Sequence, residues 1–407
     1  MDADASAHSD PVRGGGGNRA LRALFLWQLT MHRTWVELDE QALISNIKTL
    51  RALSEGARFC AVVKANAYGH GMKEVAQIAS RAGVSAFAVD ELDDALELRA
   101  LFPSALIVVI GYVMFHRFAE AIRENIELTV YDREGVLHAE TIAASTASAA
   151  RIHVKVETGT SRQGVLMDDL DDLLLEIGRS KHLVLSGLST HFANIEDTAN
   201  PEYASLQFSR FTEAVAAATR HGFSPEFIHC ACSAAILLFP DTHGTLVRAG
   251  ISLYGLWPTP MIEELIRKQN ISCDLRPVLR WKTRIAQIKS LPTGTPISYG
   301  LTERLKQRSR IAVLPVGYWD GYDRRLSSVG EVLVGGHRCK VMGRVCMNMI
   351  MADISAVPKV EKEQVATLIG VDGRHEVTAA ELARKCQTIP YEIIARINPL
   401  LPRVIVG

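Results

Sequence analysis

The sequence alternates between short apolar runs and amphipathic stretches from Arg58 to Arg248, and this repetition constrains the fold more than any other feature. Several of the runs are almost continuously apolar, as expected for strands of a parallel sheet that is covered on both faces. Between the runs, apolar residues recur at helical spacing. The strand-like runs are Arg58–Val63, Ser85–Val89, Ala105–Ile110, Leu128–Val130, Ile152–Val156, Leu183–Leu188, Phe227–His229 and Leu246–Arg248.

This alternation amounts to about eight strand–helix units in about 200 residues, which predicts an α/β fold with a (β/α)8 TIM-like barrel. A doubly wound open sheet is the main alternative. However, the glycine-rich fingerprint of a dinucleotide site does not follow the first strand. At 407 residues, the chain is long enough to hold a second domain.

The pattern changes after Pro258, where period-two alternation with Gly and Asp between the runs is typical of antiparallel strands. We therefore predict a barrel over residues 32–258 and a mostly antiparallel β domain over 259–407, which ends in a helix near Ala379–Cys386. A strand at 33–38 precedes the barrel, and the sequence leaves open whether it packs with the second domain. The strands expected after Pro258 are Val278–Ile288, Ile311–Val316, Glu331–Val334, Lys340–Val341 and Met349–Ile354.

Residues 1–31 fit neither domain. They contain the glycine run Gly14–Gly17, and Met31 stands directly before the first convincing strand. A signal peptide is an alternative because Leu21–Met31 follows two arginines, but Gln28 interrupts its apolar core and no small-residue cleavage site follows. We expect an unstructured leader or a misassigned start.

Composition and charge argue against several classes of partner. Forty-five basic residues balance forty-five acidic ones, so no overall field would attract nucleic acid or an anionic membrane. No apolar run approaches the ~18 residues that a transmembrane helix needs. The seven cysteines are an odd number without framework spacing, which predicts reduced thiols and a cytoplasmic location. His229, Cys230 and Cys232 fit no common zinc spacing, so we expect no metal.

Lys64 stands at the end of an apolar strand, where a lysine is unusual. Burying an ammonium group is costly unless the group is paired or has reacted, and the C-terminal rim of a barrel is where active sites lie. A partly desolvated lysine at that rim can bond covalently to an aldehyde cofactor. The alternative is an ordinary lysine whose charged end reaches solvent.

The segment around Lys64, VVKANAYGHG at Val62–Gly71, closely resembles the cofactor-lysine signature of alanine racemases. The resemblance extends over nearly all of Arg33 to Val406, with the motifs in the family's order. It implies an isomerase that uses pyridoxal 5'-phosphate to interconvert L-alanine and D-alanine, the latter for peptidoglycan. The other matching segments are Lys155–Gly164, Ser189–Ala193, His229–Ala235, Val247–Gly255, Ser298–Gly300, Leu314–Tyr318 and Gly343–Met347.

The resemblance also implies which residues bind the cofactor. Hydroxyl groups and backbone amides would surround its phosphate, in the loops after the seventh and eighth strands where barrels commonly bind phosphate. Arg248 would face the pyridine nitrogen and, being unable to give up its proton, would keep the ring neutral and disfavour transamination. The cofactor residues implied are Lys64, Tyr68, His191, Ser233, Arg248, Gly250, Ile251 and Tyr391.

Substrate binding is assigned by the same resemblance to Arg162, Met347 and Tyr318. The planar fork of Arg162 suits a carboxylate. Lys155 is similar to a lysine that is carbamylated in the family and that holds this arginine in place. An unmodified ammonium at Lys155 would repel Arg162, which makes the modification electrostatically reasonable.

Racemisation needs one base on each face of the α-carbon. By resemblance, Lys64 serves one face and Tyr299 the other. A tyrosine acts as a base near neutral pH only when cationic or hydrogen-bonding neighbours stabilise its phenolate, and His191 linked to Arg248 would do so. In the family this tyrosine comes from a second subunit, so the resemblance implies a homodimer.

Three positions depart from the family's usual pattern, namely Asn348, Cys232 and Thr160. They put the fine tuning of substrate binding in doubt, but not the reaction class. A broad-specificity amino-acid racemase is the nearest alternative, and a non-catalytic protein that binds pyridoxal phosphate is a further one. A related decarboxylase of basic amino acids would need an acidic pocket, which Lys155 and Arg162 do not provide.

Overall fold

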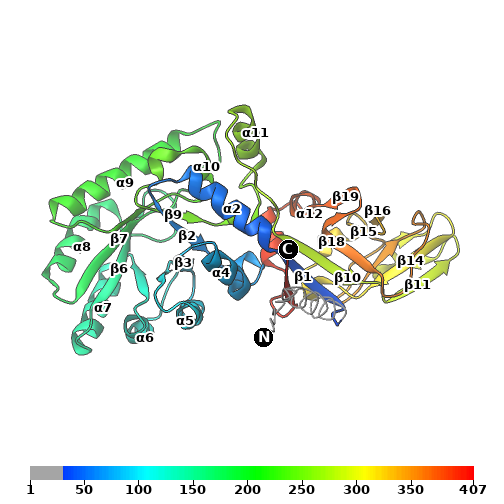
Figure 1. The fold of residues 1–407 in the computed structure, drawn as a ribbon, viewed down its shortest axis with the longest axis horizontal. Coiled ribbons are helices and arrows are strands. Elements are labelled where there is room, and N and C mark those ends of the chain that lie inside the picture. The colour runs from blue at the N-terminus through cyan, green and yellow to red at the C-terminus, as the bar shows by residue number, and fades with distance from the viewer. Residues whose placement is uncertain (1–30) are drawn as a thin grey trace, which may run out of the picture.

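A computed structural model describes residues 31–407, so the expected leader lies outside the described residues apart from Met31. Figure 1 shows a barrel wrapped in helices on one side and a domain rich in strands on the other. Within the described chain, no helix has both the length and the apolar character needed to cross a bilayer.

An eight-stranded, all-parallel sheet forms the barrel, in the order β8-β7-β6-β5-β4-β3-β2-β9. The (β/α)8 prediction is therefore confirmed. Thr245, directly before β9, closes this order: its amide donates to the carbonyl of Ile228 in β8, and its carbonyl accepts from the amide of Arg58 in β2. The strands are β2 (Arg58–Val62), β3 (Ala86–Val89), β4 (Leu106–Val109), β5 (Glu127–Val130), β6 (Ala150–Lys155), β7 (Leu183–Ser189), β8 (Phe227–His229) and β9 (Leu246–Ala249).

Amphipathic helices cover the outside of this sheet. In one of them the apolar face Leu170, Leu173, Leu174 and Ile177 is buried against the barrel. Some of these helices begin at a side-chain cap. For example, the carboxylate of Asp39 accepts a hydrogen bond from the amide of Ala42 at the start of the helix that follows. The helices are α2 (Glu40–Leu53), α4 (Met72–Arg81), α5 (Leu92–Leu101), α6 (Phe118–Arg123), α7 (Arg133–Ser145), α8 (Met167–Arg179), α9 (Glu202–Arg220), α10 (Ser233–Leu238) and α11 (Pro260–Lys268).

A seven-stranded sheet organises the second domain, which is mostly antiparallel as predicted. The first strand of the described chain, β1 (Thr34–Asp39), lies in this sheet and not in the barrel. It pairs antiparallel with β10 (Leu279–Arg284) and parallel with β20 (Arg403–Val406). The sheet also contains β15 (Glu331–Val334), β16 (His337–Lys340), β18 (Val365–Asp372) and β19 (His375–Val377).

Two expectations for this domain were wrong. The run Val278–Ile288 is not one strand, because the chain leaves β10 after Arg284 and joins a three-stranded sheet as β11 (Gln287–Leu291). The domain also does not end in the helix α12 (Ala379–Cys386), since α13 (Pro390–Ala395) and β20 follow. The remaining strands are β12 (Pro296–Ile297), β13 (Glu303–Arg304), β14 (Ser309–Leu314) and β17 (Ile350–Asp353).

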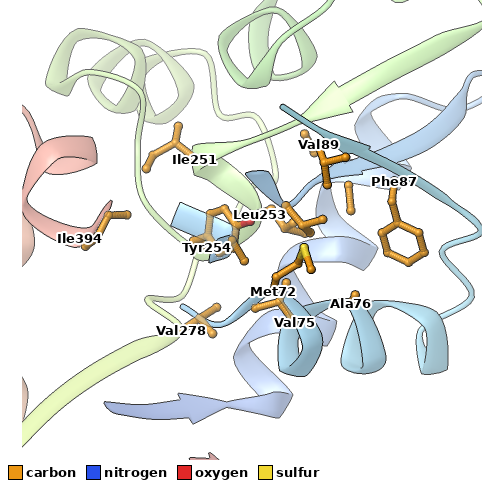
Figure 2. Packing of buried hydrophobic residues seen from close by; sticks show 14 of the residues in the cluster. Met72, Val75, Ala76, Phe87, Val89, Ile251, Leu253, Tyr254, Val278 and Ile394 are labelled. Carbon is orange, nitrogen blue, oxygen red and sulfur yellow. The ribbon is translucent and has the colours of Figure 1, made fainter. Parts of the chain in front are cut away.

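The core continues from the barrel into the second domain. Figure 2 shows Tyr254 at this junction, with Val278 and Ile394 of the second domain on one side and residues of α4 on the other. The hydroxyl of Tyr254 donates to the carbonyl of Val62, 2.7 Å away. The two domains therefore share one packed interior directly next to the end of β2.

The segment after β2 has an unusual backbone. Ala65, Asn66, Ala67 and Tyr68, all within α3 (Lys64–Tyr68), have φ between 52° and 54°. A left-handed conformation is costly for residues with a Cβ and persists only when the surroundings impose it. Here the amide of Gly71 donates to the carbonyl of Asn66, and the Asn66 side chain accepts from the amide of Met72. The left-handed backbone next to Lys64 therefore lowers the stability of the folded state, and the surrounding contacts offset this cost.

We expect Ala65→Gly to raise the free energy of unfolding by about 1 kcal/mol, because glycine adopts positive φ without the Cβ penalty. Ala65 is exposed, so no packing is lost. Urea unfolding followed by circular dichroism measures the change. The matched control is Ala52→Gly on the exposed, right-handed part of α2, which should lower stability by up to about 1 kcal/mol. A destabilised Ala65→Gly variant would contradict the strain argument.

Candidate active site

Five residues expected in the site lie where barrel strands end: four that would bind the cofactor, and Lys155, which would hold Arg162. Lys64 follows β2, His191 follows β7, Ser233 follows β8, Lys155 ends β6, and Arg248 lies in β9. All five strands are parallel, so these positions face the same rim of the barrel.

Lys64 is paired with a carboxylate that the sequence analysis did not foresee. Its Nζ atom lies 3.1 Å from Oδ1 of Asp90, at the end of the neighbouring strand β3. Asp90 stands shortly before a helix, where its carboxylate could be read from the sequence as an N-cap, but α5 begins after Glu91, which makes no side-chain cap bond. Gly111 allows this arrangement, since a Cβ there would lie 2.9 Å from the Asp90 carboxyl carbon. A strand-end aspartate before a helix is indistinguishable in sequence from an N-cap.

Ser233, Gly250 and Tyr68 meet in a small polar cradle. The Ser233 hydroxyl accepts from the amides of Gly250, at 3.0 Å, and Ser252, at 3.2 Å. A Cβ on Gly250 would lie 2.8 Å from the Tyr68 hydroxyl, so a side chain there would fill the cradle. The ring of Tyr391, from α13, lies 6.1 Å from that of Tyr68. Ile251 contributes a buried side chain.

The hydroxyl groups in this cradle stay protonated. Burial raises the pKa of Tyr68 to about 12, and burial also raises the pKa of Tyr391 above its usual value. Neutral O–H and N–H donors that are already held in place suit an oxyanion such as a phosphate ester. The observation that a Cβ at Gly250 would fill this space indicates that the residues present fit a phosphate group.

Arg248 is buried, and its guanidinium is held by several acceptors. Its Nη2 atom donates to the carbonyl of Thr190 at 2.8 Å, and Nη1 donates to the carbonyl of His229 at 2.7 Å and to the Nδ1 atom of the same histidine. The Nδ1 atom of His191 lies 3.5 Å from Nη2. Burial and the charge of Arg248 lower the pKa of His191 to about 3, so this ring is neutral.

Lys155 lies in the same region of positive charge. Its Nζ donates to Oε1 of Gln163 at 3.0 Å. Burial, followed by the charges of Arg162, Arg248 and Lys64, lowers the pKa of Lys155 to about 8. Arg162 is exposed, and its backbone amide donates to the carboxylate of Glu157. The structure thus gathers Lys155 with the cations predicted to bind substrate and cofactor.

The second-domain residues are arranged differently. Tyr299 is 73% exposed, which means that its ring packs against very little of its own chain. Tyr318 and Met347 are also exposed, and they lie on adjacent loops because the amide of Tyr318 donates to the carbonyl of Cys346. None of the hydrogen bonds in residues 31–407 joins Tyr299 to Lys64. Among the predicted second-domain residues, only Tyr391 contacts the barrel site described above.

Sequence reasoning missed two further contributors. Tyr254 fixes the end of β2 through Val62 and packs 5.1 Å from the ring of Tyr68. Thr190 supplies the carbonyl that accepts from Arg248. Both stand inside segments that the sequence analysis had singled out, but a backbone carbonyl or a core tyrosine has no distinguishing pattern of its own. Within residues 31–407, no three His, Cys, Asp or Glu side chains form a group that could hold a metal ion.

Models of known families match nearly the whole described chain. The N-terminal domain of alanine racemase matches residues 38–258, and the C-terminal domain of alanine racemase matches residues 278–405. An alanine racemase of Leptospira interrogans is 34% identical over 378 residues, which span 92% of this chain and 96% of that protein.

Solved structures give the same result. The alanine racemase of Bacillus anthracis with bound L-Ala-P superimposes with a TM-score of 0.85 at 35% identity, covering 92% of this chain and 95% of the other. A histidine racemase of Leuconostoc mesenteroides reaches 0.83 at 27% identity, over 92% of this chain and 98% of that one. With two family models in sequence over one barrel and one β domain, the chain belongs to the alanine racemase family.

Proposed function

We propose that this chain racemises alanine with pyridoxal 5'-phosphate, using Lys64 and Tyr299 as the two bases. The observation that carries the proposal is the rim of the barrel, where Lys64, the cradle of Ser233 and Gly250, and the buried Arg248 lie on neighbouring parallel strands. We also propose a cytoplasmic location and a role in supplying D-alanine for peptidoglycan. All seven cysteines are thiols in the structure, which supports a reducing compartment.

The barrel residues divide the binding of the cofactor between them. Lys64 would hold its aldehyde carbon, and Tyr68, Tyr391 and Ser233, with the amides of Gly250 and Ile251, would bind its phosphate. Arg248 would donate to its ring nitrogen. When bound, pyridoxal phosphate supplies an electron sink that makes the substrate's α-proton removable. Because Arg248 keeps its own proton, it would leave the ring nitrogen unprotonated, which would disfavour transamination.

The remaining residues bind alanine and move its proton. Arg162 would bind the substrate carboxylate, with Tyr318 and Met347 limiting the space for its side chain. Lys64 Nζ would exchange the α-proton on one face and Tyr299 Oη on the other. His191 supports this second role: its Nδ1 atom faces Arg248, which can only donate, so its Nε2 atom carries the proton and can donate to a phenolate.

The exposure of Tyr299 supports a homodimer. Loops of the second domain expose several large apolar side chains, and exposed apolar side chains in number are typical of a protein–protein interface. A second copy of the chain that covers it would bring Tyr299 to the rim of the partner barrel, and each site would then contain residues of both subunits. The exposed apolar residues on these loops are Tyr299, Leu301, Tyr318, Trp319, Met347 and Met349.

The test of the proposed function is a spectrum of the purified protein followed by chiral analysis of its product. We expect bound cofactor, which borohydride should attach covalently to Lys64 as found by peptide mass spectrometry, and conversion of L-alanine to D-alanine. L-serine and L-histidine, tested in parallel, measure breadth of specificity. Equal turnover of all three would favour a broad-specificity racemase, and bound cofactor without any turnover would favour a non-catalytic binding protein.

Tyr299→Phe should lower turnover by roughly 10²–10⁴-fold, because one of the two proton-transfer groups is lost. Removal of the proton from L-alanine should suffer more than removal from D-alanine, measured as loss of deuterium from each α-deuterated enantiomer. Equal losses in both directions would count against the two-base assignment.

Mixing provides the control for the shared site. Tyr299→Phe and Lys64→Ala homodimers should both be inactive, but a dimer with one chain of each has one intact site. Refolding an equal mixture should therefore restore roughly a quarter of the activity of the unmodified protein. No recovery would mean that both bases come from the same chain.

Carbamylation of Lys155 predicts a pH dependence. Only the uncharged amine reacts with CO2, and the pKa of Lys155 is lowered to about 8. At constant dissolved CO2, the carbamate signal in carbon-13 NMR should therefore fall as the pH drops below about 8. Lys155→Met should remove the signal. Lys282→Met is the matched control, since Lys282 is a partly buried lysine whose pKa is also lowered by burial. An active enzyme without a carbamate signal would refute this modification.

A further inference from the structure

A line of buried polar side chains begins at Arg248 and crosses the interior of the barrel. Its other members, His229, His153 and Glu127, have no role in the reaction proposed above. Nη1 of Arg248 faces Nδ1 of His229. Nε2 of His229 lies 2.8 Å from Nδ1 of His153, and Nε2 of His153 lies 2.6 Å from Oε2 of Glu127. These four residues come from β9, β8, β6 and β5, and none is more than 8% exposed. A buried polar chain of this length is expensive unless every member is satisfied.

The barrel makes room for this line. The ladder between β6 and β7 shifts register between Ile152 and His153, where Gly187 lies opposite. A Cβ on Gly187 would come within 2.2 Å of Nδ1 of His153. The ring of His153 also stacks on Phe227, with the ring centroids 5.8 Å apart. The strands are therefore shaped around one position of the His153 ring.

The two ends of the line determine where its protons lie. Arg248 can only donate, so Nδ1 of His229 must accept and the proton of this neutral ring must be on Nε2. That proton points at Nδ1 of His153, which must also accept, so the His153 proton is on Nε2 and points at Glu127. Glu127 can accept because it is ionised: burial opposes its charge, but hydrogen bonds from His153 and Arg151 prevail and lower its pKa to about 2.

We propose that Glu127 is a positioning residue for Arg248. By accepting from His153, it sets the tautomers of both histidines so that His229 presents a lone pair, and not an N–H group, to the guanidinium. The functional consequence, a correctly aimed arginine at the ring nitrogen of pyridoxal phosphate, rests on the proposed function. The arrangement of protons along the line does not depend on the proposed function.

Glu127→Gln tests this with almost no change in shape. Glu127 accepts from Arg151 Nε through one oxygen, at 2.6 Å, and from His153 through the other. Glutamine has one acceptor oxygen, and Arg151 cannot become an acceptor. The amide oxygen therefore faces Arg151 and the NH2 group faces His153. Both histidines must then move their proton to Nδ1, and His229 turns an N–H group toward Arg248.

Neutron diffraction from perdeuterated crystals reads these positions directly. In the unmodified protein we expect deuterium on Nε2 of His153 and His229 and none on Nδ1. In Glu127→Gln we expect the reverse, together with roughly tenfold weaker binding of pyridoxal phosphate by equilibrium titration. Unchanged tautomers in the variant would overturn the proposal, as would reversed tautomers with unchanged affinity.

Two further variants separate the relay from general damage. Glu226→Gln is the matched control, since Glu226 also pairs with Arg151, at 3.5 Å, but does not contact His153. In this variant the tautomers of His153 and His229 and the affinity for pyridoxal phosphate should match those of the unmodified protein. Adding Arg151→Met to Glu127→Gln should restore both, because the amide oxygen is then free to accept from His153 while Ser186, now relieved of Arg151, accepts from the NH2 group. A double variant no better than Glu127→Gln would overturn the proposal.

If Glu127→Gln fails to fold, the unmodified protein still decides, since deuterium on Nδ1 of either histidine would refute the arrangement. If instead the unmodified protein binds no pyridoxal phosphate, the proposed function fails, and the deuterium positions still judge the relay by themselves.

Discussion

The rest of the site depends on one buried cation. Arg248 cannot give up its proton, and burying it without acceptors would be prohibitive. The carbonyls of Thr190 and His229 and the ring of His229 accept hydrogen bonds from its guanidinium, and these acceptors come from the ends of two further strands. These contacts fix the ends of β7, β8 and β9 relative to one another. The same requirement continues inward to His153 and Glu127, so one half of the barrel interior is polar.

The other half of the barrel interior is apolar, with Cys60, Val62, Ala88 and Val108 among its residues. This half carries Lys64 at its end. The apolar side chains pack along the strand that presents the lysine, whereas the polar half supplies the acceptors for the arginine.

The second domain acts on the site from two directions. Within one chain, α13 and β20 press on the segment after β2: a Cβ on Gly69 would lie 2.0 Å from the carbonyl of Ile394, and Arg403 donates to the carbonyl of Gly69 at 2.8 Å. This packing holds the left-handed backbone next to Lys64. Tyr299 lies on an exposed loop and packs against little of its own chain, and this exposure is why the proposed function includes a second copy of the chain.

Much of this could be read from the sequence. The apolar runs indicated parallel strands buried on both faces, and their count of about eight favoured a barrel over a doubly wound open sheet. The motif around Lys64 indicated the chemistry. The bounds of β8 and α12 agree with the expectation to the residue. By contrast, the pattern of Val278–Ile288 could not reveal a strand that changes sheets, because half-buried strands alternate in the same way in either sheet.

Only the tertiary structure decided which residues distant in sequence pair with one another. Asp90 reads as a helix cap until Lys64 is seen 3.1 Å away. Glu127 stands directly before one expected strand and His153 lies within the next, and only the pairing of β5 with β6 brings their side chains within 2.6 Å of one another. Local sequence determines which strands and helices form, because that depends on neighbouring residues. Where protons and charges finally lie depends on contacts across the barrel, which no local pattern records.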